Sequence, residues 1–104
     1  MSGPELTVGR GVIDEMVRLA AFGIPGVARV SRGGPAWRAM LAGPPIMTQL
    51  SADGVRVRIW IVARPGQALL PLGQQVRAAV GAAIERLLDL RLESVTVTVD
   101  GVGG

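Results

Sequence analysis

A two-residue alternation of hydrophobic and polar positions marks the segment from Val55 to Ala63. Its odd-numbered positions are all apolar, namely Val55, Val57, Ile59, Ile61 and Ala63. The positions between them hold Arg56, Arg58, Trp60 and Val62. Because neighbouring strand residues point to opposite faces of a sheet, this segment is predicted to be a strand with one apolar face and one face that carries Arg and Trp.

Two other segments, Val12–Phe22 and Leu69–Leu90, have apolar residues at helical spacing instead. The stripe of the first consists of Ile13, Met16, Val17, Ala20 and Ala21. The stripe of the second consists of Leu72, Val76, Ala79, Val80, Ala83, Ile84 and Leu87. Gly11 is predicted to cap the first helix, and Gly23 to end it in the left-handed conformation. Each helix therefore has one face that must be buried.

Four further segments favour strands, and they are Leu6–Val8, Val27–Ser31, Ile46–Leu50 and Ser94–Asp100. Asp53–Gly54 favours a tight hairpin turn. Residues 32–45 are predicted to be a long loop that contains a short helical turn. The expected order is strand, helix, strand, strand, strand, helix, strand.

These elements predict an α/β fold of the α+β kind, a small mixed β-sheet with two amphipathic helices packed on one face. The length fits a single domain, residues 1–104, with tails at 1–4 and 101–104. The other face of the sheet would then be open. That outer face is the candidate interaction face, and it would carry Arg56, Arg58, Trp60, Thr96 and Thr98.

Three hypotheses apply to this outer face. A second copy of the protein could pair with it, since Trp and Arg are enriched at interface hot spots. Single-stranded nucleic acid could stack on Trp60 while Arg neutralises phosphates. The third hypothesis is an ordinary solvated face, or one over which the 32–45 loop folds. The Gly-x-x-Gly sequence Gly23–Gly26 is typical of KH domains, although helix termination explains it completely.

The composition limits the chemistry that this chain can perform. It contains no His, Cys, Tyr, Lys or Asn. No imidazole, thiolate or amine is therefore available for proton transfer, nucleophilic attack or Schiff-base formation. We predict no catalytic residues, no metal site and no cofactor, and we expect a protein that is not an enzyme.

The formal net charge is +3, and all of the positive side chains are Arg. This balance favours an acidic partner, although a biased coding composition produces the same excess. The sequence has neither a disulfide nor a recognisable signal peptide, and its apolar runs are too short to span a membrane. We therefore expect a soluble cytoplasmic domain.

Four segments also occur in a characteristic order and spacing. They are Val12–Val27 with its Ile-Pro-Gly-Val turn, the strand after Gly54, the helix after Gly66, and the terminal strand Ser94–Val102. Together they resemble the alkaline shock protein family, also called envelope stress response proteins. The resemblance covers Leu6 to Val102.

The resemblance implies a non-enzymatic bacterial protein of the stress response that is cytoplasmic or peripheral at the inner face of the cell membrane. A membrane-anchoring protein would hold it there. We therefore predict a scaffold or interaction module that forms homo-oligomers through the outer sheet face. The alternative is a KH-like nucleic-acid-binding domain, and nucleic acid is otherwise not expected as a partner.

Overall fold

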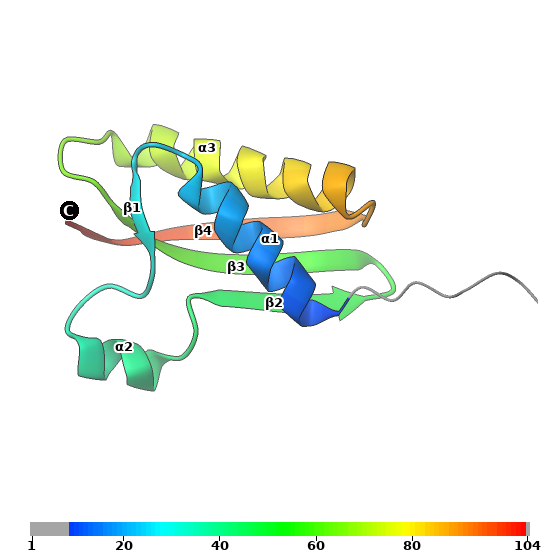
Figure 1. Cartoon of the computed structure of the whole chain (residues 1–104), viewed down its shortest axis with the longest axis horizontal. Helices are drawn as coiled ribbons and strands as arrows, with labels where there is room; N and C mark the ends of the chain where they lie inside the picture. Colours follow the sequence, from blue (N-terminus) through cyan, green and yellow to red (C-terminus); the bar gives the residue numbers. More distant parts are fainter. Residues whose placement is uncertain (1–8, 104) are drawn as a thin grey trace, which may run out of the picture.

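The strand predicted from the two-residue alternation is the centre of a four-stranded mixed sheet (Figure 1). The computed structural model describes residues 9–103. Its helices are α1 (Arg10–Phe22), α2 (Ala36–Ala42) and α3 (Leu69–Ala82), and α3 continues into a π-helical turn, Ala83–Leu87. Its strands are β1 (Val27–Val30), β2 (Ile46–Ser51), β3 (Gly54–Ala63) and β4 (Leu92–Val102).

Strand β3 pairs with all three other strands. β4 runs parallel to it along most of its length. β2 pairs antiparallel with residues 54–59 of β3, and β1 pairs antiparallel with residues 61–63. Because a strand has only two edges, and β4 overlaps both of these stretches, β1 and β2 must follow one another along the same edge. β4 is therefore an edge strand in the part of the chain that the structure describes.

Both long helices pack on one face of this sheet, as the sequence predicted. Helix α1 contributes Ile13, Val17 and Ala21 to the core, and the helical segment 69–87 contributes Leu72, Val76, Val80 and Ile84. They meet the inward side chains of β3, which are Val55, Val57, Ile59, Ile61 and Ala63. The mixed sheet with two helices on one side is confirmed, and apolar burial on both layers is its physical cause.

The structure corrects the predicted ends of α1. Gly9, not Gly11, is the N-cap residue. Gly23 has φ −68° and ψ −13°, so the predicted left-handed conformation is wrong. The chain leaves the helix in a right-handed turn instead, in which the Ile24 N–H donates to the Ala21 carbonyl oxygen at 3.1 Å. Pro25 has no N–H with which to extend the helix further.

The last elements also differ from the prediction. The α-helix ends at Ala82 rather than near Leu90, because the backbone widens into the π-helical turn. Asp89 then takes a left-handed conformation, φ 52°, and reverses the chain. β4 extends to Val102, so residues 101 and 102 are not a tail. The predicted strand Leu6–Val8 lies outside the described residues.

The 32–45 segment is a loop that contains helix α2, in agreement with the predicted helical turn. One end of this loop is held against β4, where the Gly33 N–H donates to Asp100 Oδ2 at 2.8 Å. A Cβ atom on Gly33 would overlap the carbonyl oxygen of Asp100, so only glycine fits this approach. No helix of the described residues is both long and apolar enough to cross a membrane.

Candidate functional site

Strands β3 and β4 bring the five predicted residues together on the outer face of the sheet. The register places Arg58 beside Thr96 and Trp60 beside Thr98. Arg56, Arg58 and Thr96 are exposed, and together with Met47, Gln49 and Ser94 they line an open hollow of about 510 Å³. The sequence alternation therefore placed these side chains on the correct face. That the face binds a partner stays a prediction.

Trp60 does not present a bare ring, and our expectation of an open face is wrong at this residue. Only 7% of Trp60 is exposed. The Arg32 guanidinium lies 3.4 Å from the centroid of its ring, and that of Arg58 lies 5.0 Å away. A cation above an indole ring is attracted by its electron-rich face. Arg32 begins the 32–45 loop, so the third hypothesis, a loop folded over the face, describes this end of the sheet.

A single ion pair ties the other end of the outer face together among residues 9–103. Arg56 Nη2 of β3 lies 2.7 Å from Glu93 Oε1 of β4. The hydrogen bond from Arg56, more than any other cause, lowers the pKa of the Glu93 carboxyl below its ordinary value. The same contact raises the pKa of Arg56. Both groups are solvated, so this pair orients two side chains and adds little to stability.

A second surface, which sequence reasoning missed, is the free edge of β4. Its residues 94–99 alternate Ser or Thr with Val and lie between Glu93 and Asp100 without a charge. Val and Thr both favour strands. A strand edge that has no neighbour exposes backbone N–H and C=O groups, which pair readily with another strand. The Val/Thr alternation was visible in the sequence, but its position at an edge was not.

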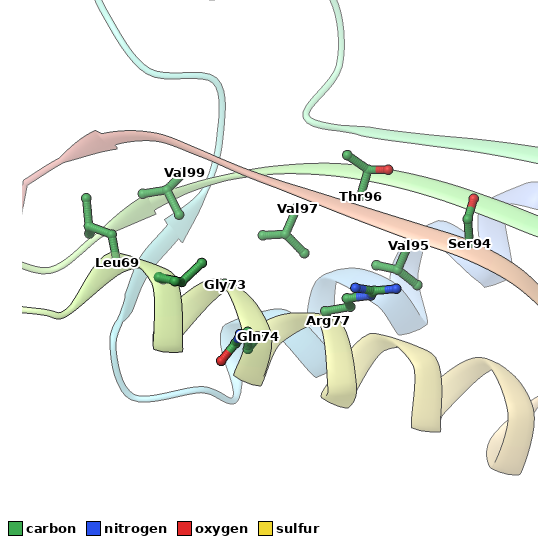
Figure 2. A pocket seen from close by; sticks show the side chains of 10 residues that line it. Leu69, Gly73, Gln74, Arg77, Ser94, Val95, Thr96, Val97 and Val99 are labelled. Atoms are coloured by element: carbon green, nitrogen blue, oxygen red, sulfur yellow. The ribbon is translucent and has the colours of Figure 1, made fainter.

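A groove of about 750 Å³ with a mixed polar and apolar lining follows the same edge on the helix side (Figure 2). Val95, Val97 and Val99 of β4 point toward α3 in this view, whereas Ser94 and Thr96 point away from it. The facing part of α3 supplies Leu69, Leu70, Gly73, Gln74 and Arg77. Gly73 leaves the α3 side of the groove without a side chain at that turn. Val97 and Val99 are consequently only partly buried.

The Gly-x-x-Gly sequence forms the turn between α1 and β1. Gly26 is buried there, and a Cβ atom on it would meet Leu72 Cδ1 and the side chain of Gln67. The glycine is thus required for close packing against α3 and the loop before it. Packing accounts for this glycine without a nucleic-acid ligand.

Comparisons with known proteins give structural neighbours but no family. No family model matches the chain, and no curated protein matches it. Solved structures of the C-terminal domain (CTD) of MamM do resemble it. A zinc form of one MamM CTD variant is 18% identical and covers 88% of this chain and 84% of its own, with a TM-score of 0.57.

Two further MamM CTD variants agree with that result. A manganese form is 18% identical over 89% of this chain and 99% of its own, with a TM-score of 0.58. A copper form is 17% identical over 89% and 98%, with a TM-score of 0.59. Similarity at this level of identity shows a shared fold alone.

These findings overturn the predicted family. The solved neighbours are MamM CTDs rather than alkaline shock proteins, and no family model supports the resemblance. The function derived from it, an envelope stress scaffold, is therefore wrong. The KH-like alternative is wrong as well, because the neighbours are not KH domains and the Gly-x-x-Gly turn is a packed core element.

Proposed function

We propose that this chain is a non-catalytic interaction module that forms a homodimer by pairing the free edges of β4. The observation that carries the proposal is the uncharged edge of residues 94–99, which lies beside the groove between α3 and β4. The absence of His, Cys and Lys from the chain supports a role in binding rather than catalysis. A second copy is the occupant because the edge is complementary to itself, as follows.

An antiparallel pair of β4 strands related by a two-fold axis at Val97 matches like side chains on both faces of the sheet. Val97 then lies opposite Val97 of the second copy, and Val95 lies opposite Val99 of the second copy. Thr96 faces Thr98 of the second copy on the other side of the sheet. Since directly opposite residues of an antiparallel pair share a face, this register keeps every Val with Val and every Thr with Thr.

The same register joins the two sheets into one and brings the α3 helices of both copies alongside each other. Each groove between α3 and β4 would then be closed by the α3 helix of the second copy. Burial of Leu70 and of the partly exposed Val97 and Val99 would remove apolar surface from water. Covering a strand edge in this way is a common solution to the exposure of its backbone groups.

The structural neighbours are C-terminal domains of MamM, and so parts of a larger protein. Their zinc, copper and manganese forms are not carried over to this chain. It has no His or Cys, and residues 9–103 contain no group of three or more His, Cys, Asp or Glu side chains that could hold an ion. Imidazole and thiolate are the usual ligands of zinc and copper.

Charge changes at Ser94 test the proposed register. Ser94 is exposed, and the two-fold axis at Val97 places it opposite Asp100 of the second copy. Ser94→Arg should therefore tighten the dimer, and Ser94→Glu should weaken it. Each cross-strand pair is worth about 0.2–1 kcal/mol and occurs twice, so Kd should change by about 2- to 30-fold in each direction. Sedimentation equilibrium measures that Kd.

Gln49→Arg and Gln49→Glu are the matched controls. In the protomer both Ser94 and Gln49 lie beside Arg56, one on each neighbouring strand. Within one protomer, Arg56 therefore repels an Arg at either position and attracts a Glu at either position. At Ser94 these intramolecular effects oppose the expected change in dimer affinity, so the two can be told apart. A protein that stays monomeric at high concentration, or Ser94 variants that match the Gln49 variants, would refute edge pairing.

A further inference from the structure

Helix α2 carries a hydrophobic surface that nothing in the described protomer covers. Its seven residues include none that is buried. Trp37, Met40 and Leu41 are 61%, 83% and 81% exposed. Positions i, i+3 and i+4 of a helix share one face, so these three side chains form a single apolar ridge. Exposed large apolar clusters of this kind mark interaction sites.

The ridge projects from the body of the molecule. Figure 1 shows α2 at one end of the fold, on the side of β2 and away from β4, joined to β1 and β2 by two connecting segments. Gly33-Gly34-Pro35 precedes it, and Gly43-Pro44-Pro45 follows it. The helix lies apart from the β4 edge in this view, so the ridge is separate from the proposed dimer interface.

The stretch of sequence that contains α2 carries only positive charges. Residues 16–52 contain no Asp or Glu, and they contain the four arginines Arg18, Arg29, Arg32 and Arg38. The guanidinium of Arg38 lies 5.6 Å from the ring centroid of Trp37 on α2 itself. The carboxylate that approaches this loop from elsewhere, Asp100, accepts the hydrogen bond of the Gly33 N–H. The ridge therefore has one cation beside it, Arg38, and a second, Arg32, lies at the base of the same loop.

This combination matches the chemistry of an anionic lipid surface. Trp is enriched at the level of lipid headgroups, where one side of the ring is apolar and the other is polar. Arg can lie along an apolar surface while its guanidinium stays at the phosphates. The negative surface potential of anionic lipids attracts basic segments next to an inserted apolar element.

We infer that α2 is a membrane-contact element that inserts Trp37, Met40 and Leu41 among the headgroups of an anionic bilayer, with Arg38 at the lipid phosphates. A protein partner is the competing occupant, and it would need a cavity shaped to this ridge. Arg38 favours lipid, because a positive charge beside the apolar ridge complements a surface of phosphates, and such a surface needs no matching shape.

Vesicle flotation tests the inference with the full chain. The vesicles contain either phosphatidylcholine alone or phosphatidylcholine with phosphatidylglycerol. We expect binding to the vesicles with phosphatidylglycerol and much weaker binding to the neutral ones. Met40→Gln with Leu41→Gln should lower the partition coefficient about tenfold or more, since two apolar side chains no longer insert. Arg38→Gln should lower it about fivefold, and only on the anionic vesicles.

Leu19→Gln with Leu87→Gln is the matched control, because both leucines are exposed but lie on α1 and the π-helical turn. It should bind as the unchanged protein does. A Trp60→Phe variant leaves Trp37 as the single Trp, and its fluorescence should shift to shorter wavelength on the anionic vesicles. Circular dichroism confirms that each variant is folded.

Three results would overturn the inference. They are no binding to anionic vesicles, equal binding by the α2 double variant and the control, and an unshifted Trp37 emission on vesicles that do bind. If the α2 double variant instead lowers the mass measured by sedimentation, the ridge is a protein contact. The Ser94 variants do not alter α2, so a failure of edge pairing leaves this test unaffected.

Discussion

One partly buried hydrogen bond between side chains joins α1 to the sheet, in addition to the apolar packing. Thr48 Oγ1 of β2 donates a hydrogen bond of 2.6 Å to Asp14 Oδ1 of α1. Thr48 is the one buried polar residue of the described chain, and Asp14 is half-buried. A short hydrogen bond to a carboxylate is stronger than one between neutral groups. It also fixes how far α1 lies along β2.

Replacing Thr48 with Val should destabilise the protomer. Val keeps the shape of the side chain but leaves the Asp14 carboxylate without its donor, so the free energy of unfolding should fall by about 1–3 kcal/mol. Urea unfolding followed by circular dichroism measures this change. Thr48→Ser retains the hydroxyl and should lose much less of it. Equal losses for Val and Ser would mean that packing, not the hydrogen bond, holds α1 here.

Arg32, a loop residue, determines how much of the strand residue Trp60 is exposed to solvent. The alternation of β3 directs Trp60 outward, and this was correct. Arg32 then covers the ring, and its Nε also donates to the Pro44 carbonyl oxygen at 3.3 Å, which closes the base of the loop. The arginine thus satisfies its own donor while it shields an indole that would otherwise be hydrated.

Among the elements, β4 combines two roles on its two edges. Its inner edge pairs with β3, and Glu93 at its start reaches Arg56 of that strand. Its outer edge is free in the described chain and is the proposed dimer contact. Most strands with a free edge carry a charge or a proline there, which blocks further pairing. Residues 94–99 carry neither, and this is why the edge is a candidate interface rather than an ordinary border.

The link between β3 and β4 should depend on pH through Glu93. Its pKa in the folded state is lowered, chiefly by the hydrogen bond from Arg56. The stabilisation is therefore complete above the ordinary value of 4.5 and is lost as the pH falls toward the lower folded pKa. Arg56→Gln should be slightly less stable than the unchanged protein at neutral pH, and this difference should shrink as the pH falls from 4.5 to 3.

Urea midpoints at neutral pH and at pH 3 test this expectation, with Arg58→Gln as the control. Arg58 lies near Trp60, and it is not in an ion pair within residues 9–103. The stability difference between Arg58→Gln and the unchanged protein should therefore not shrink as the pH falls. A constant difference between the Arg56 variant and the unchanged protein from neutral pH to pH 3 would contradict the role of this ion pair.

On the scale of the whole molecule, edge pairing couples folding to protein concentration. A dimer that dissociates on unfolding has a melting temperature that rises with concentration, because mass action favours the associated folded state. Scanning calorimetry over a hundredfold range of concentration should show this rise. Ser94→Glu should flatten it and Ser94→Arg should preserve it. A melting temperature that is independent of concentration in the unchanged protein would count against the dimer.

The local pattern of the sequence was sufficient for the main elements. The periodicities at 55–63, 12–22 and 69–90 predicted the strand and helices that are β3, α1 and α3, although α3 ends earlier, at Ala82. Each of these segments must bury one apolar face, and that need is visible in its own residues. The same rule placed both helices on one side of the sheet. It also placed Arg56, Arg58 and Thr96 together on the other side, because side-chain direction in a strand follows position parity alone.

The tertiary structure decided everything that depends on residues far apart in the chain. Two strands share one edge of β3, so β4 is left at the border, and no local pattern encodes that choice. Arg32 reaches Trp60 across 28 positions, and Gly33 meets Asp100 across 67. Such contacts depend on where separate elements are brought together by packing. Periodicity reports only which face of an element is apolar, and for that reason the sequence alone could not reveal the covered indole, the free edge or the projecting helix.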